Sequence, residues 1–285
     1  MLRRPLTPMN IYLRERGTGS TIKRWLCGFI CGVGCAIFAA IASASDADDP
    51  AKLFSSIKKT VQETMQNEHM HLGFAVYPEE PNERDLFFCF DAGTELGIPY
   101  RSSREWATTI ALDLEVFKTE LDALKVPRDV SAKSFAAIEA FGMATLRDEV
   151  PKADDEFFAY REKRSAEYVD LLKEFAKDLN AYAATRTGMP HFHVEGGCGA
   201  LGQEVTVKTT PPGGTVSYIP VFSFKVCEAT HVDPNDPEKC DGWITAVNAT
   251  ESMVGKYKYL ATWPDGKKKS GTLNVTGKTK VDISQ

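Results

Sequence analysis

Apolar residues return every three or four positions through much of the first half of the chain, which is the spacing of one face of an amphipathic helix. Ser102 and Glu105 form a capping box at the start of one such run, and Pro127 stops it. The predicted helices cover 50–67, the run from Ser102 to Pro127, a stretch that ends at Val150-Pro151, and about 154–187. Helices of this kind predict an antiparallel bundle.

Two shorter apolar runs interrupt the helical pattern. They are "HLGFAVY" (71–77) and "DLFFCF" (85–90), and the polar, proline-containing "PEEPNER" separates them. We therefore expect two short strands joined by a loop of hairpin-like length, packed against the bundle.

The pattern changes after residue 188. Segment 189–203 is rich in glycine and is interpreted as a linker. Beyond it, apolar and polar residues alternate, which is the period of a strand. The residues that share one predicted strand face, interrupted by Pro220, are Val216, Tyr218, Phe222, Phe224 and Val226. We predict an α+β protein: a mainly helical domain with a short β-hairpin over 45–188, then a small, disulfide-stapled antiparallel β-sandwich over 204–285.

Residues 1–44 have the layout of an export signal or a signal anchor. The stretch from Leu26 to Ala44 carries no charge, follows a basic segment, and ends in an A-x-A cleavage pattern. Positive flanks resist translocation, so we expect residues 45–285 outside the cytosol, in the periplasm or cell envelope. The alternative is an uncleaved anchor in the inner membrane, with membrane contact through 25–44. Gly28 and Gly32 would then let two such helices approach closely.

The net negative charge of the chain argues against a nucleic-acid partner. The full chain has 34 basic and 39 acidic residues, and residues 45–285 have 28 basic and 38 acidic ones. A chain this acidic lacks the electrostatic footprint of a nucleic-acid-binding protein, so we expect no nucleic-acid partner.

Four cysteines follow the predicted leader: Cys89, Cys198, Cys227 and Cys240. An even number in an oxidising compartment predicts two disulfides, of which three pairings are possible. Cys227–Cys240 is the expected pair because the loop between them is short and rich in turn residues. Cys89–Cys198 would then be the second, and free thiols are the alternative.

Histidines supply the first candidate chemistry. Four of the five occur as H-x-H pairs, His69/His71 and His191/His193. Alternate residues of a strand point the same way, so His191, His193 and Glu195 would present two imidazoles and a carboxylate to one transition metal ion. The first pair, with Glu68, would join from its own segment. Solvated or hydrogen-bonded histidines are the competing interpretation.

Two further groups offer binding chemistry. One is a cluster of oxygen-bearing side chains that would suit calcium, although ordinary turn chemistry is the favoured interpretation. Its members are Asp233, Asn235, Asp236, Glu238 and Asp241. The other is a set of aromatic residues that would stack on sugar rings or peptides, unless they fill the sandwich core. Its members are Tyr218, Trp243, Tyr257, Tyr259 and Trp263.

The β half also shows a family resemblance. "EVTVKTTPPGGTVSY" (204–218) resembles the opening of PEGA-type repeats, and "GKYKYLATWPDGKKKSGTLNVTGKTKVDIS" (255–284) is similar to their closing strands and to carboxypeptidase-regulatory-like domains. The signature tetrapeptide departs at two of four places, and the segment with Cys227, Cys240 and Trp243 is an insertion. The resemblance implies an extracytoplasmic β-sandwich of a non-catalytic adhesion or scaffolding kind.

These patterns lead to three functional hypotheses. The sequence lacks a phosphate loop, a G-x-S-x-G and an H-E-x-x-H, so no enzyme class is indicated. The leading hypothesis is an exported, non-catalytic cell-envelope protein that binds a protein or glycan partner and needs no cofactor. The second is a metal-binding protein or metal-dependent enzyme that uses the H-x-H pairs. The third is a membrane-anchored assembly factor.

Overall fold

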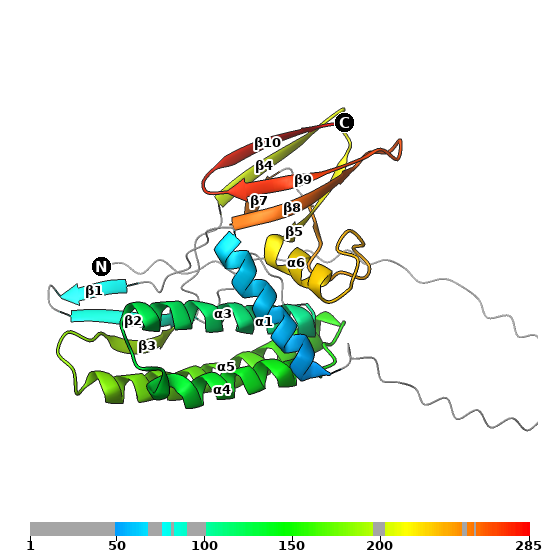
Figure 1. Ribbon diagram of the computed structural model, residues 1–285. Helices are drawn as coiled ribbons and strands as arrows, with labels where there is room; N and C mark the ends of the chain where they lie inside the picture. Colours follow the sequence, from blue (N-terminus) through cyan, green and yellow to red (C-terminus); the bar gives the residue numbers. More distant parts are fainter. Residues whose placement is uncertain are drawn as a thin grey trace, which may run out of the picture. The chain divides into compact units, whose positions relative to one another are not determined.

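The computed structural model describes residues 49–67, 76–80, 83–89, 101–195, 203–246, 250–253 and 255–285, and it leaves the side chains of 76–80, 83–89, 195 and 250–252 undescribed. All of these residues belong to one compact unit. The described part is mixed α+β, with five helices and ten strands, which confirms the predicted class (Figure 1). We call residues 49–195 the helical half and residues 203–285 the β half.

The helical half contains the helices that the apolar spacing predicts. Their bounds are α1 (Pro50–Asn67), α3 (Ser103–Ala123), α4 (Arg128–Thr145) and α5 (Asp154–Ala183). The Asp49 carboxylate accepts a hydrogen bond from the Ala51 amide at the start of α1. The Ser102 hydroxyl accepts one from the Glu105 amide at 3.2 Å and so caps α3. None of the described helices combines the length and the apolar character that crossing a membrane requires.

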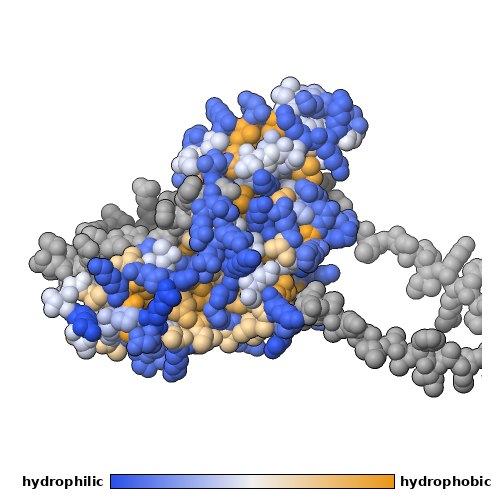
Figure 2. Space-filling view, viewed as in Figure 1, coloured by the Kyte–Doolittle hydropathy of each residue, from blue (hydrophilic) through white to orange (hydrophobic). Residues whose placement is uncertain are grey.

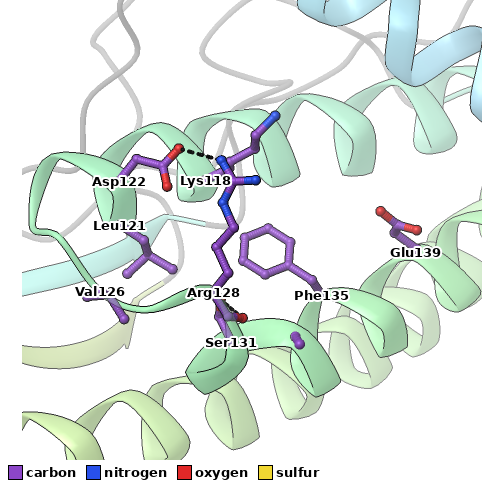
Figure 3. Close-up of a pocket in the computed structure, with 9 residues that line it drawn as sticks. Lys118, Leu121, Asp122, Val126, Arg128, Ser131, Phe135 and Glu139 are labelled. Carbon is purple, nitrogen blue, oxygen red and sulfur yellow. Dashed lines mark hydrogen bonds and ion pairs between the residues drawn. The ribbon is translucent and has the colours of Figure 1, made fainter.

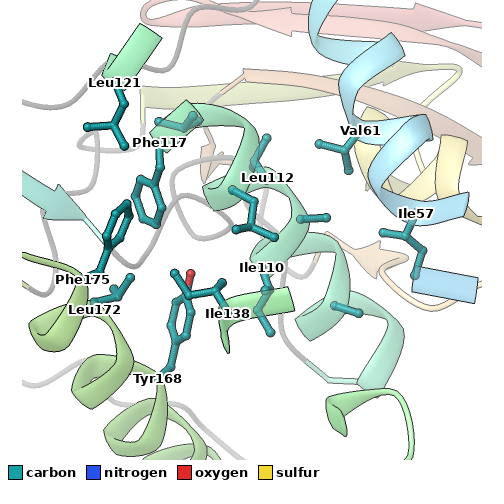
Figure 4. Close-up of a cluster of buried hydrophobic side chains, with 14 of the residues drawn as sticks. Ile57, Val61, Ile110, Leu112, Phe117, Leu121, Ile138, Tyr168, Leu172 and Phe175 are labelled. Carbon is teal, nitrogen blue, oxygen red and sulfur yellow. The ribbon is translucent and has the colours of Figure 1, made fainter. Parts of the chain in front are cut away.

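A single apolar cluster holds these helices together (Figure 4). Helix α3 is its centre, because it packs against both α1 and α4 and buries residues on almost every side. Phe117 of α3 and Phe135 of α4 both lie against the ring of Phe175 on α5, with ring centroids 6.0 and 5.4 Å apart. The four helices therefore pack around one shared core, and packing of this kind is where most helical stability in proteins comes from.

A small sheet joins the helical half, in the strand order β1-β2-β3. Strands β1 (Val76–Glu80) and β2 (Glu83–Cys89) pair antiparallel, which confirms the predicted hairpin with a shorter connection than expected. Strand β3 (His191–Glu195) pairs parallel with β2. The interpretation of 189–203 as a linker is therefore wrong for 191–195. The physical reason is that Phe192, only 2% exposed, is part of the helical core.

The β half contains two sheets, with strand orders β10-β4-β7 and β6-β5-β8-β9. Their bounds are β4 (Gln203–Thr210), β5 (Thr215–Pro220), β6 (Ile244–Thr245), β7 (Thr250–Met253), β8 (Gly255–Thr262), β9 (Lys268–Val275) and β10 (Thr279–Ser284). The expectation of purely antiparallel pairing is wrong for one pair, because β10 runs parallel to β4. Parallel neighbours need a long crossover, and local alternation does not reveal such a partner.

Helix α6 (Val221–Ala229) replaces the predicted continuation of β5. Pro220 ends the strand and precedes the first turn of the helix, a position where its fixed φ and missing N–H are tolerated. Phe222 and Val226, four positions apart, share one helical face and enter the core of the helical half. Helix α6 contacts α1 and α3 as well as β5 and β8, so it is the element that the two halves share.

Candidate functional site

The structure brings together one of the two predicted histidine pairs. His191 Nδ1 and His193 Nε2 lie 2.8 Å apart, with ring centroids separated by 4.3 Å. The side chain of His191 is exposed and that of His193 is half-buried. His69, His71 and Glu68 lie outside the described residues, as does the side chain of Glu195. Within the part of the chain that the structure describes, no three His, Cys, Asp or Glu residues converge as a metal site.

The cysteine prediction is confirmed for one pair. Cys227 of α6 and Cys240 form a disulfide with Cα atoms 5.8 Å apart. Both are buried, and they pack with Ile219 of β5 in a small apolar cluster. Cys198 lies outside the described residues, and Cys89 is described only as a backbone position in β2, so the second pairing stays a prediction.

The acidic loop inside this disulfide uses its carboxylates to form turns. Asp233 Oδ1 accepts a hydrogen bond from the Asn235 amide, and Asp236 Oδ1 accepts one from the Glu238 amide, each at 3.0 Å. The Lys239 ammonium donates to the other Asp236 oxygen at 2.6 Å, and it holds the pKa of Asp236 below its ordinary value. These contacts are the turn chemistry that competed with the calcium hypothesis.

The predicted aromatic platform is mostly a core. Tyr257 and Trp263 are 3% and 2% exposed and belong to the apolar cluster of the β half, as does Tyr218. The Tyr259 side chain lies over Gly271 on the neighbouring strand, since a Cβ added at Gly271 would be 2.5 Å from the phenolic oxygen. Trp243 is half-buried and donates its indole N–H to Pro234 O. The set therefore packs the interior instead of presenting a flat aromatic surface.

The face of the four-stranded sheet that points away from the apolar cluster of the β half is mostly polar. The pairing registers place twelve residues on it, which we call the open sheet face. They are Thr215, Ser217, Ile219, Thr245, Lys256, Lys258, Leu260, Thr262, Lys268, Ser270, Thr272 and Asn274. Ile219 packs with α6, and most of the others carry a hydroxyl, amide or ammonium group. None of the twelve is a carboxylate.

Charge is distributed unevenly around this face. Residues 255–285 contain seven lysines against two aspartates, whereas residues 45–254 contain 21 basic and 36 acidic residues. The Lys258 ammonium donates to the Thr272 hydroxyl at 3.0 Å and lies 5.9 Å from the ring centroid of Phe224 on α6. Lys268 is exposed on β9 at the edge of the sheet. A positive, hydroxyl-bearing surface therefore stands in an otherwise acidic chain.

A buried carboxyl group is the site that the sequence analysis treated only as a helix cap. Glu105 is 2% exposed, and its Oε2 accepts a hydrogen bond from the Arg101 amide at 2.6 Å. Its Oε1 has no hydrogen-bond partner. Burial raises the pKa of Glu105 to about 7, and the nearby carboxylate of Asp241 acts in the same direction. Hydrogen bonds from the Arg101 and Ser102 amides oppose this rise.

The surroundings of Glu105 come from three elements. A Cβ added at Gly242, which has φ +96°, would lie 2.9 Å from Glu105 Oε1 and 3.1 Å from the Cβ of Ser223 on α6. The hydroxyl of Ser223 is buried without a hydrogen-bond partner. The Arg104 guanidinium faces Asp241 at 3.6 Å. Such a carboxyl group takes up or releases a proton near neutral pH, and the sequence signal for it was the capping box alone.

A shallow cavity of about 270 Å³ lies between the end of α3 and the start of α4 (Figure 3). Leu121, Val126 and Phe135 form its apolar wall. The charges at its rim are paired with one another or with neighbours, as in Arg128–Asp122 at 3.7 Å. Because its rim charges already have partners, this cavity offers a ligand mainly apolar contacts and few groups for specific recognition.

Comparisons with known proteins add no relative: no family model, curated protein or solved structure matches the chain.

Proposed function

We propose that this chain is an exported, non-catalytic protein of the cell envelope whose β half is a β-sandwich that binds an anionic glycan. The observation that carries the proposal is the open sheet face, which presents hydroxyl, amide and ammonium groups without any carboxylate. Hydroxyls and amides match the hydrogen-bonding groups of sugars, and lysines match their carboxylate, sulfate or phosphate groups.

Contacts between the two sheets support the sandwich. Residues from both sheets, such as Val205 of β4 and Leu273 of β9, belong to one apolar cluster. The Lys269 ammonium on β9 donates to Ser284 O on β10 at 2.7 Å. The indole N–H of Trp263, after β8, donates to Pro211 O, after β4, at 2.9 Å. Shared apolar burial and links of this kind are typical of two sheets packed face to face.

The disulfide supports export. Cys227 and Cys240 are bonded and fully buried, and such bonds persist in oxidising compartments outside the cytosol. The basic, then apolar, then small-residue layout of 1–44 supports the same location.

Geometry favours an extended polymer over a small ligand. The open sheet face is built from parallel rows, for example Thr215–Thr262–Lys268 and Lys256–Asn274. Adjacent strands repeat these groups about every 4.8 Å, so a chain of sugar rings meets donors and acceptors at regular intervals. On the face of the molecule shown in Figure 2, hydrophilic residues cover most of the described surface.

The test is binding of the purified mature chain to heparin and polygalacturonate, with dextran as the neutral glycan and poly-glutamate as the anionic peptide. We expect both anionic glycans to bind, with affinity that falls as salt rises, because exposed charges are screened. Lys268→Glu should weaken binding about tenfold. Lys280→Glu is the matched control, since it makes the same charge change on an exposed residue of β10, in the other sheet.

Three outcomes would overturn the proposal. One is that neither anionic glycan binds at low salt. Another is that poly-glutamate binds as well as the glycans do, which would make the partner an acidic protein. The third is equal weakening by Lys268→Glu and Lys280→Glu, which would reduce the effect to net charge.

A further inference from the structure

Strand β3 is fixed in two ways: helix α5 binds one edge of its backbone, and one of its side chains is buried in the helical core. The Asn180 side chain of α5 accepts a hydrogen bond from the Phe192 amide at 2.7 Å and donates one to Phe192 O at 2.8 Å. This side-chain amide makes the two bonds that a neighbouring strand would make. The Phe192 ring is buried in the helical core. The residue between the two histidines is thus fixed in both its backbone and its ring.

Fixing Phe192 determines where the histidines lie. Successive residues of a strand point to opposite faces, so a buried Phe192 places His191 and His193 together on the other face. Their rings meet there, and their closest nitrogens are 2.8 Å apart. The pair is held in place before any ligand arrives, which lowers the ordering cost of binding.

The separation of the two ring nitrogens is compatible with two adjacent ligands on one metal ion. Metal–imidazole bonds are about 2.0–2.1 Å long, so two nitrogens at adjacent corners of a square-planar or octahedral ion are about 2.8–3.0 Å apart. Two nitrogens on a tetrahedral ion are about 3.3 Å apart. The observed 2.8 Å is the length of a hydrogen bond between the two rings, and it already lies close to the separation of the first arrangement. A small turn of each ring directs its lone pair at an ion in place of the hydrogen bond between them.

We propose that His191 and His193 form a two-imidazole site for a divalent transition ion with tetragonal geometry, and that copper(II) is the ion that this site binds most tightly. Copper(II) prefers this geometry and stands highest in affinity among the first-row divalent ions. Water or an external donor completes the coordination, because the described residues add no third His, Cys, Asp or Glu to the pair. The site lies in the helical half, and it is independent of the glycan-binding proposal.

The test is titration of the purified, untagged mature chain with copper(II) sulfate, followed by calorimetry and electron paramagnetic resonance. We expect one ion per chain and an axial spectrum with two coordinated imidazole nitrogens. Zinc sulfate should bind at least tenfold more weakly. Affinity should fall as pH decreases, because protons compete for the ring nitrogens.

Variants separate the site from adventitious binding. His191→Ala and His193→Ala should each lower copper affinity at least tenfold and remove one nitrogen from the spectrum. His231→Ala is the matched control, because His231 is an exposed histidine in the disulfide loop and should not change binding. Asn180→Ala tests the positioning role, and we expect a loss of about tenfold with the two-nitrogen spectrum retained.

Several results would overturn the site. Copper binding that is unchanged in His191→Ala and His193→Ala would place the ion elsewhere. Binding that is abolished by His69→Ala with His71→Ala would show that the described pair does not suffice. A circular dichroism spectrum identical to that of the unmodified chain is required of every variant, and any variant that fails it is replaced by His191→Gln or His193→Gln.

Discussion

The two halves of the protein are stabilised in different ways. The helical half buries one large cluster in which α3 is surrounded by neighbouring helices, and aromatic side chains such as Phe117 and Phe175 fill its centre. The β half buries a smaller cluster, to which residues of both sheets contribute, and adds a disulfide. A small core leaves more of the stability to cross-links and to backbone pairing.

Helix α6 contributes buried side chains to apolar clusters in both halves. It follows β5 in the sequence, yet Phe222 and Val226 belong to the core of the helical half, while Cys227 belongs to the cluster beside the sheet. The polar site at Glu105 and Ser223 lies at the same junction. One short helix therefore links two differently built cores, and each prediction below tests that link or one of the cores it joins.

The largest effect is expected from Phe222→Ala. Truncating this buried ring leaves a cavity in the helical core, and we expect a loss of about 3–5 kcal/mol in the free energy of unfolding. Denaturation measured by circular dichroism and by tryptophan fluorescence should give one shared, shifted transition. Phe224→Ala, on the same helix but half-buried, should cost clearly less. Two separate transitions would show that α6 does not couple the halves.

The second prediction concerns the pH dependence that Glu105 confers. Its pKa is about 7 in the folded chain and near 4.5 in the unfolded one. Between these values the folded chain keeps a proton that the unfolded chain releases, so stability falls as pH rises. The loss is complete above pH 7 and amounts to about 3 kcal/mol.

Glu105→Gln should remove this slope, because the amide does not ionise. Urea denaturation at pH 4.5, 6 and 7.5 measures it. Glu156→Gln changes an exposed carboxylate near the start of α5 and should keep the slope of the unmodified chain. An unchanged slope in the Glu105→Gln variant would assign the pH dependence to other groups.

The third prediction concerns the disulfide. Reduction, or the double change Cys227→Ala with Cys240→Ala, should lower the free energy of unfolding by about 3 kcal/mol, since the bond closes a loop between cysteines that are 13 positions apart. The measurement is chemical denaturation with and without reductant. If reductant shifts the double variant as much as the unmodified chain, the shift has another cause.

The smallest effect is expected inside the β half, from Gly271→Ala. The new methyl group would meet the Tyr259 ring at about 2.5 Å, and overpacking of this kind costs about 1–3 kcal/mol. Thermal unfolding measures it. In a Tyr259→Leu background the same change should cost less, because the obstructing ring is gone. An equal cost in both backgrounds would point to backbone strain instead.

Local signals predicted much of the fold. The Ser102–Glu105 pair located the start of α3, and Pro127 located the boundary between α3 and α4, because caps and prolines act through adjacent backbone groups. The β-strand pattern failed at α6, where Phe222, Phe224 and Val226 alternate like a strand. Phe222 and Val226, four positions apart, also fit one face of a helix, and only the core that receives them decides between the two structures.

The candidate sites show the same limit. The Cys227–Cys240 bond was predictable because its loop is short. The burial of Glu105 was not, because it depends on Ser223 and Gly242, more than 100 positions away. Tyr257 was recognisable as an aromatic position on a strand, but which face of the sheet it occupies follows from its pairing partners. Distant partners are the information that a local pattern lacks.

The Asn180 side chain has one more consequence. Exposed strand edges are places where proteins join edge to edge and polymerise. Strand β3 ends its sheet, and the amide and carbonyl of Phe192 are the groups that an incoming strand from another copy would need. Because Asn180 already holds both, strand addition is blocked at the middle of that edge, and the protein is protected there against aggregation at high local concentration.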